Sequence, residues 1–115
     1  RDVYWASDCH VLTSRGESFG RVSAEAMLCG RPVLSTPVGA AREMVLDGRT
    51  GHIVPLDDPT ALADRLQAWL HEPDKRARMA EAAREHAAAS FSRQRMIENV
   101  LKVYGEAIEA KARKP

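Results

Sequence analysis

The sequence predicts an α/β fold in which about three short parallel strands alternate with helices. Three segments rich in strand-forming residues, at 9–13, 32–36 and 51–55, are each bounded by Gly, Pro or Ser. Segments with helical periodicity separate them, and this alternation is typical of βα units around a parallel sheet. A three-stranded sheet is thin and leaves both edges to be covered. We therefore expect a partial sheet, completed by strands from a longer protein or by another chain.

Two helices are predicted between the strands. The first covers about 19–29, with Val22, Ala26 and Cys29 on one face. Gly30-Arg31-Pro32 ends it, because Gly suits the left-handed position after a helix and Pro cannot continue one. A shorter helix is predicted over 41–46, and the turn residues of 47–51 lead into the third strand.

After the third strand, the sequence predicts three consecutive helices. Asp58-Pro59 is a strong start signal, because Asp accepts hydrogen bonds from free backbone N–H groups and Pro is favoured at the first helical position. Pro73 breaks this helix, a second follows over 75–89, and Ser92 caps a final helix of about 93–112. The residues expected on their apolar faces are Leu62, Leu66, Trp69 and Leu70, then Met79, Ala83 and Ala87, and finally Ile97, Val100, Leu101, Tyr104 and Ile108.

Composition excludes several classes of function. The net charge is +1 and both signs are interspersed, which is unlike a nucleic-acid-binding stripe. No apolar run approaches the roughly 20 residues that span a bilayer, so any membrane association would be peripheral and through a longer parent protein. Cys9 and Cys29 stand alone in segments that we expect to be buried, which predicts reduced core residues in a cytoplasmic protein. The four histidines lack metal-ligand spacing, and we expect no metal site.

The segment with most chemical information is the loop after the first strand, residues 14–20, which we call the Glu17 loop. Ligands of open parallel sheets bind beyond the carboxyl ends of the strands, where this loop lies. The start of the next helix offers unpaired N–H groups and partial positive charge to a phosphate, and Gly20 permits close approach. Glu17 precedes this helix start and Glu25 lies about 7 Å along the axis beyond it. Such carboxylates can accept hydrogen bonds from hydroxyls on either side of a bound diphosphate.

The same residues also have purely structural interpretations. Glu17 is a residue type favoured near any helix N-terminus, and Glu25 has the character of an ordinary surface residue. Phe19 is expected to be a core anchor rather than a stacking platform for a ligand. A pair of glutamates alone therefore does not define a function.

The run Glu17-Ser18-Phe19-Gly20-Arg21-Val22-Ser23-Ala24-Glu25-Ala26-Met27 resembles the signature of family 4 of the GT-B glycosyltransferases, also called glycosyl transferases group 1. That signature has two glutamates separated by seven residues, with Phe-Gly after the first and Ala-Met after the second. The resemblance extends, in order, through Gly30-Arg31-Pro32-Val33 and 47–54 to Tyr104. It implies a Rossmann-like three-layer fold and the C-terminal portion of a GT-B domain, so that residues 1–115 form a single partial nucleotide-sugar-binding domain.

The resemblance also implies roles for the matched residues. Glu17 would be the catalytic-site residue that binds hydroxyls of the donor sugar near the reacting carbon, and Glu25 would bind the ribose hydroxyls. The diphosphate would be held by Ser18 and by the backbone amides of Phe19, Gly20, Arg21 and Val22. Transfer would retain the anomeric configuration and use no metal or other cofactor, because the helix end and basic side chains stabilise the leaving group.

The chain lacks parts that the family carries elsewhere, namely a basic Arg and Lys pair and an N-terminal domain that binds the acceptor. We do not assign the side chain of Arg15 or Arg21 to the role of this basic pair. We therefore expect a donor-binding fragment that is inactive alone and acts together with the missing N-terminal domain. We also expect its exposed sheet edge to favour self-association. The alternatives are a non-catalytic α/β structural or interaction module of GT-B ancestry, and a phosphorylase-like or epimerase-like GT-B protein.

Overall fold

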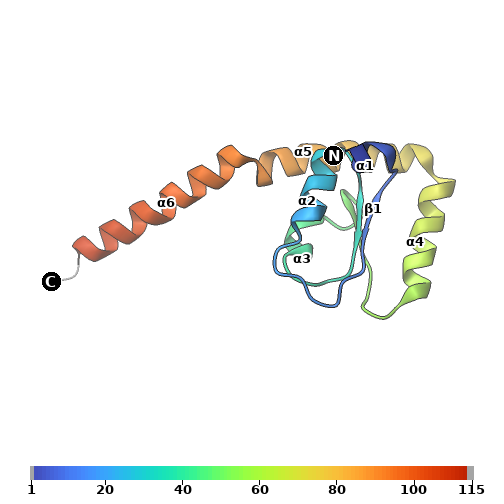
Figure 1. Ribbon diagram of the computed structural model, residues 1–115, viewed down its shortest axis with the longest axis horizontal. Coiled ribbons are helices and arrows are strands. Elements are labelled where there is room, and N and C mark those ends of the chain that lie inside the picture. Colours follow the sequence, from blue (N-terminus) through green and yellow to red (C-terminus); the bar gives the residue numbers. More distant parts are fainter. Residues whose placement is uncertain (1, 114–115) are drawn as a thin grey trace.

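The fold, given by a computed structural model that describes residues 2–113, is a parallel sheet flanked by helices (Figure 1). The elements, in chain order, are α1 (Asp2–Ala6), β1 (His10–Leu12), α2 (Arg21–Leu28), β2 (Val33–Ser35), α3 (Ala41–Met44), β3 (Gly51–Ile53), α4 (Pro59–His71), α5 (Pro73–Phe91) and α6 (Arg93–Ala112). All three predicted strands are present and parallel, in the order β1-β2-β3. The predicted α/β class is confirmed.

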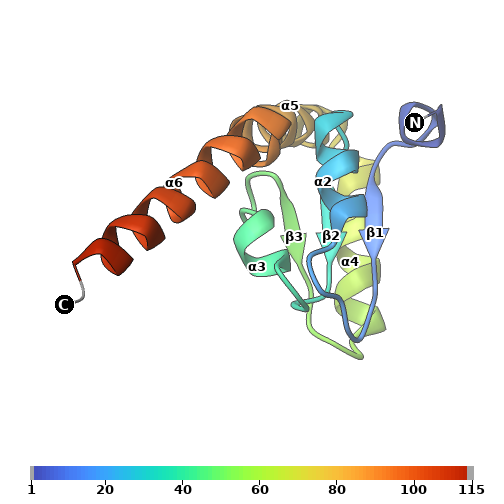
Figure 2. The same cartoon turned by 60° about the vertical axis from the view of Figure 1, so that its left-hand side comes forward.

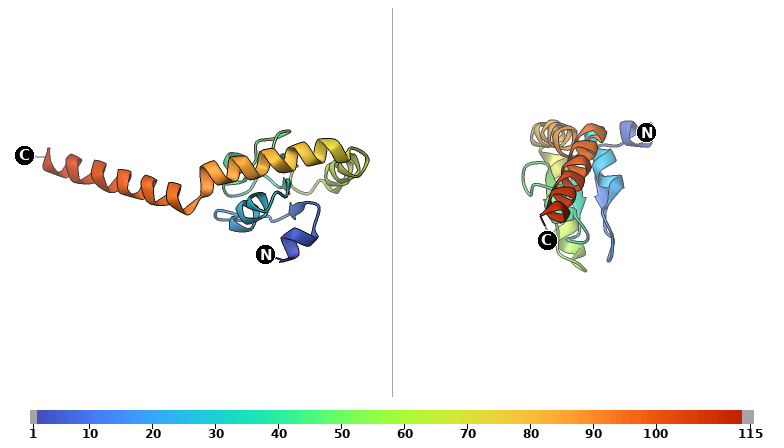
Figure 3. Two further views of the ribbon diagram at one scale, coloured as in Figure 1. Left: turned by 90° about the horizontal axis from the view of Figure 1, so that it is seen from above. Right: turned by 90° about the vertical axis from the view of Figure 1, so that its left-hand side faces the viewer.

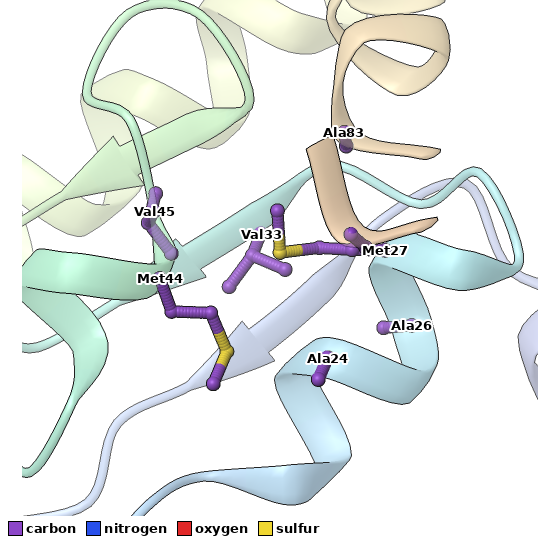
Figure 4. Packing of buried hydrophobic residues seen from close by; sticks show 8 residues of the cluster. Ala24, Ala26, Met27, Val33, Met44, Val45 and Ala83 are labelled. Carbon is purple, nitrogen blue, oxygen red and sulfur yellow. The ribbon is translucent and has the colours of Figure 1, made fainter. Parts of the chain in front are cut away.

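The sheet separates two hydrophobic clusters, which makes the fold three-layered (Figure 2). On one side, α2 and α3 pack on the sheet together with the second half of α5. On the other side, α4 packs with the start of α5. Successive residues of a strand point to opposite faces, so Val33 joins the first cluster and Leu34 the second. Figure 4 shows Val33 between Met27 of α2 and Met44 of α3.

The buried face of α2 differs from the predicted one. Val22 is 40% exposed and Cys29 is only half-buried, whereas Met27 is completely buried. The helix begins at Arg21 rather than at residue 19, and its large side chain Met27 fills the space against the sheet. Cys9 is also half-buried but packs against the second hydrophobic cluster, so both cysteines are free thiols at the margin of the core rather than fully inside it.

The predicted start signal of α4 and the predicted break before α5 are both present. Asp58 Oδ1 accepts a hydrogen bond from the Ala61 amide at 2.9 Å, and Pro59 is the first residue of α4. Pro73 starts α5 directly after Glu72, so the break between the two helices is a single residue. Trp69, Met79, Ala83 and Ala87 are buried as predicted. Leu70 is 72% exposed, because its neighbour Trp69 takes the place on the buried face.

Helix α6 has the predicted bounds, but its apolar face has no cover within residues 2–113. Ser92 caps it by accepting a hydrogen bond from the Arg95 amide at 3.2 Å. The helix points away from the sheet (Figures 1 and 3), and none of its residues is buried. The apolar residues that are exposed along it include Ile97, Val100, Leu101, Tyr104 and Ile108. The pattern thus identified the helix correctly but not a packing partner in this chain.

No helix within residues 2–113 combines the length and the apolar character needed to cross a lipid bilayer.

Candidate functional site

The Glu17 loop leaves the carboxyl end of β1 and leads into the first turn of α2 (Figure 2). It therefore lies at the edge of the sheet where open parallel sheets bind their ligands. Because the loop connects neighbouring elements of one βα unit, it brings Glu17, Gly20 and the start of α2 together. The fold thus confirms the predicted position of the loop between the first strand and the following helix.

Gly20 is the residue that allows the loop to turn into the helix. It is the N-cap of α2, it is buried, and its φ of 81° lies in the left-handed region that favours glycine. The Ser23 amide donates to the Gly20 carbonyl at 2.9 Å, which closes the first turn. The amides of Arg21 and Val22 lie in this turn, where backbone N–H groups have no intrahelical partner. Of the four predicted amides, those of Phe19 and Gly20 precede the helix.

The Glu17 side chain is held beside this helix start. Its Cγ lies 3.6 Å from the point where a Cβ on Gly20 would be. One carboxylate oxygen, Oε1, accepts a hydrogen bond from the amide of the exposed Ser18 at 3.2 Å. Glu17 is half-buried. The carboxylate is thus next to the positive end of the α2 dipole, which stabilises its charge.

Glu25 lies on α2, and its side chain is half exposed. The single proton of the Tyr4 hydroxyl is shared between two acceptors, the Val22 carbonyl at 3.2 Å and Glu25 Oε2 at 3.4 Å. Arg21 approaches the other carboxylate oxygen at 3.9 Å. Burial, the charge of Glu25 and the hydrogen bond to it raise the pKa of Tyr4, which keeps the hydroxyl protonated as a donor. Sequence reasoning missed Tyr4, because only folding brings α1 beside α2.

Phe19 is 45% exposed, so the expectation that it anchors the core was wrong. It precedes α2 instead of belonging to it, and its ring meets the edge of Phe91 at a centroid distance of 6.1 Å. Phe91 is the last residue of α5. This contact joins the Glu17 loop to the junction between α5 and α6.

Arg15 turns away from the two glutamates. Its guanidinium forms an ion pair with Asp57 at 2.7 Å, in the connection between β3 and α4. Both residues also line a cavity of about 330 Å³ that includes Thr13, Thr36 and Leu62 but neither glutamate. The cavity also includes the start of α4 at Asp58 and Pro59. We place the candidate site at the glutamates, because Glu17 stands beside the start of α2 in the loop that leaves the carboxyl end of β1 and Glu25 lies on the same helix. Within residues 2–113, no group of three or more His, Cys, Asp or Glu side chains is placed to hold a metal ion.

Comparison with known proteins defines the class, which is the glycosyltransferases of GT-B fold. Residues 1–86 match the family described as glycosyl transferases group 1. The chain belongs to this family.

Three relatives illustrate the similarity. A D-inositol 3-phosphate glycosyltransferase of Xylanimonas cellulosilytica is 42% identical over 106 residues, which are 92% of this chain and 25% of the relative. Sucrose-phosphate synthase from Thermosynechococcus elongatus superimposes with a TM-score of 0.85 at 32% identity, over 94% of this chain and 27% of the other. Anabaena Alr3699/HepE, solved with UDP, gives 0.84 at 30% identity, over 90% and 29%. HepE has also been solved with UDP-glucose. The chain spans about a quarter of the length of these proteins.

Proposed function

We propose that this chain is the donor-binding part of a retaining family 4 glycosyltransferase and that it binds a nucleotide sugar without a metal ion. One observation carries the proposal: Glu17 stands beside the start of α2, and Glu25 lies one turn further along the same helix, in a chain of this family. The rest of a longer enzyme, including an acceptor-binding domain, completes the active site.

Each part of the site suits one part of the donor. The first-turn amides of Arg21 and Val22, with Ser18 and the backbone of Phe19 and Gly20, hold the diphosphate at the positive end of the helix. Glu25 accepts hydrogen bonds from the ribose hydroxyls. Glu17 accepts them from the sugar hydroxyls next to the anomeric carbon, where it acts as the catalytic-site residue. Charge that develops on the leaving diphosphate is stabilised by the helix start.

Uridine is the base that we propose for the donor. The support comes from HepE, which is 30% identical over 90% of this chain and was solved with UDP and with UDP-glucose. None of the residues assigned above contacts the base, so the choice of base is tested by comparing UDP, GDP and ADP.

The test is a two-dimensional NMR amide spectrum of the chain, recorded while UDP, GDP and ADP are added in turn. We expect UDP to shift the amide peaks of residues 18–25, and the Glu25→Ala variant to require a higher UDP concentration. Glu106→Ala on α6 is the matched control, because Glu106 is an exposed helical glutamate far from the loop. It should respond to UDP as the unaltered chain does.

A second titration uses the full-length enzyme, in which the remaining phosphate ligands are present. Binding of GDP or ADP in preference to UDP would overturn the proposed base and keep the site. Absence of nucleotide binding in both proteins would overturn the function and favour a non-catalytic module.

A further inference from the structure

The segment that follows β2, residues 36–39, lies against the backbone of the Glu17 loop. The two segments are separated by about 22 residues in the sequence, and the pairing of β1 with β2 brings them together. Because β1 and β2 end side by side, the connection that follows β2 lies next to the one that follows β1. The contacts between them are made almost entirely with backbone atoms of the loop.

Thr36 holds the base of the loop. Its amide donates to the Leu12 carbonyl at 3.1 Å, which extends the pairing of the strands by one residue. Its hydroxyl donates to the Ser14 carbonyl at 2.6 Å. Thr36 is 5% exposed, so these bonds are shielded from water. The start of the Glu17 loop is therefore fixed by a neighbouring segment rather than by the loop itself.

Gly39 contacts the middle of the loop, at Glu17 itself. A Cβ at position 39 would lie 2.8 Å from the Ser18 carbonyl oxygen and 3.0 Å from the Glu17 carbonyl carbon, and it would clash outright with the Glu17 oxygen. All three atoms belong to the backbone, so no side-chain rotation can make room. The φ of Gly39 is also positive, at 54°. Any side chain at position 39 must therefore displace the Glu17–Ser18 peptide group.

We propose that residues 36–39 act as a template for the Glu17 loop, and that Gly39 is a positioning residue that sets where the Glu17 carboxylate stands. The inference rests on the proposed role of Glu17 in binding the donor sugar. Gly39 does not itself touch the donor. It lets the loop settle onto the segment after β2, and this contact fixes the Glu17 backbone relative to the start of α2.

The chain offers a matched control for Gly39. Gly48 also has a positive φ, of 76°, but a Cβ there would meet no atom within 4 Å. Both Gly39→Ala and Gly48→Ala strain a left-handed backbone, whereas only Gly39→Ala pushes on Glu17. Differences between the two variants therefore report the close approach and not the strain.

The first measurement compares amide NMR spectra of the two variants without any ligand. We expect Gly39→Ala to shift the peaks of residues 17–19, and Gly48→Ala to leave them in place. Unchanged peaks in a folded Gly39→Ala chain would overturn the template, whatever the protein binds. This measurement keeps the test independent of the proposed function.

The second measurement is made on the full-length enzyme with UDP and UDP-glucose. Gly39→Ala should weaken UDP-glucose binding while UDP binding stays as in Gly48→Ala, because the helix start and Glu25 are untouched. Misplacement of a positioned group by about 1 Å costs on the order of 100-fold in rate, so we expect kcat to fall by that order, together with the rise in donor KM that weaker UDP-glucose binding produces. Equal effects of the two variants on binding and on kcat would refute the positioning role. Failure of the unaltered enzyme to bind either UDP or UDP-glucose would instead refute the proposed uridine donor.

Thr36 supplies an independent variant pair in case Gly39→Ala does not fold. Thr36→Val removes the hydroxyl that bonds Ser14 and keeps the side-chain shape, whereas Thr36→Ser keeps the hydroxyl. We expect Thr36→Val to shift the loop peaks and lower kcat, and Thr36→Ser to restore both. A Thr36→Ser variant as impaired as Thr36→Val would contradict the template, because packing alone would then explain the loss.

Discussion

At the scale of single residues, the orientation of Glu25 depends on a tyrosine from α1, 21 residues earlier in the chain. The Tyr4 hydroxyl bonds both Glu25 and the Val22 carbonyl, so α1 is tied to the first turn of α2. Arg21 stands beside the same carboxylate. In the proposed site, a carboxylate that already has a preferred direction would lose less entropy on accepting hydrogen bonds from the two hydroxyls of a ribose. The three residues therefore form a preorganised acceptor.

Replacing Glu25 with Ala is expected to weaken nucleotide affinity and leave the fold intact. Hydrogen bonds to a charged group are worth about 1.5–3 kcal/mol, which corresponds to roughly a ten- to hundredfold loss of affinity. The side chain is half exposed, so the free energy of unfolding should change by less than about 0.5 kcal/mol. Calorimetric titration with UDP and urea unfolding measure the two quantities. A large loss of stability at unchanged affinity would contradict the assignment.

Replacing Tyr4 with Phe removes one neutral donor to the carboxylate and should lower UDP affinity by a smaller amount, about 0.5–1.5 kcal/mol. If Tyr4 acts through Glu25, the same change made in the Glu25→Ala background should have no effect on affinity. The measurement is a double-mutant cycle. Additive losses would show that Tyr4 does not act through the carboxylate.

At the scale of elements, local signals located the helices well and tertiary contacts decided their faces. Asp58 and Ser92 cap α4 and α6 as predicted, because capping depends only on residues within one turn. The buried face of α2 differs from the predicted one, because hydrophobic periodicity does not predict how well Met27 fits against the sheet. The contact of Gly39 with Glu17 was equally out of reach, since it exists only once β1 and β2 pair. The motif predicted a candidate site, and the fold revealed that Tyr4 and residues 36–39 contact its residues.

Trp69 is the main contact of α4 with the sheet, and its loss should be costly. It is 3% exposed and packs with Leu34, Val54 and Met79. Large-to-small changes of buried aromatic residues destabilise by about 3–5 kcal/mol, and we expect Trp69→Ala to do so. Denaturant unfolding gives the value. Leu70→Ala is the control, because Leu70 is the exposed neighbour, and a loss as large as that of Trp69→Ala would contradict the assignment of the buried face.

The strands carry two histidines that should make stability depend on pH. Burial lowers the pKa of His10 on β1. Burial also lowers the pKa of His52 on β3, although a hydrogen bond with Asp47 opposes the change. The unfolded chain binds protons at the ordinary histidine pKa of about 6.5. Stability from these groups is therefore complete above about pH 6.5 and is lost as the pH falls towards the lower folded values.

Urea unfolding between pH 8 and pH 5 measures this dependence directly. We expect the free energy of unfolding to decrease towards pH 5, and the decrease to be smaller in the double variant His10→Gln, His52→Gln. A free energy that rises as the pH falls would mean that charged histidines are favoured in the folded chain.

At the scale of the whole molecule, α6 gives the chain an extended shape. The radius of gyration is 17.0 Å, whereas a compact chain of this length has about 13 Å. A contiguous apolar surface such as the exposed face of α6 is normally covered by a partner. Within residues 2–113, β1 and β3 are the outer strands of the sheet. We expect the chain of residues 1–115 to associate with itself as its concentration rises.

The exposed face of α6 should contribute more to this association than the edge of the sheet, because β1 has only three residues. Sedimentation velocity of Leu101→Glu is then expected to show less association than the unaltered chain, while Val11→Lys on β1 changes it little. Both replaced side chains are exposed, so neither change should unfold the protein. The opposite ranking would assign the association to the strand edge.

Helix α6 is joined to α5 through Ser92 alone, so a rotation at this residue moves the whole helix. Its 20 residues extend about 30 Å from a single non-helical residue. A rotation of about ten degrees at Ser92 therefore swings the far end of the helix by about 5 Å, while Phe91, one residue away, stays in edge contact with Phe19. A small backbone rotation at Ser92 would thus become a large displacement at the far end of α6, while the contact beside the Glu17 loop is kept.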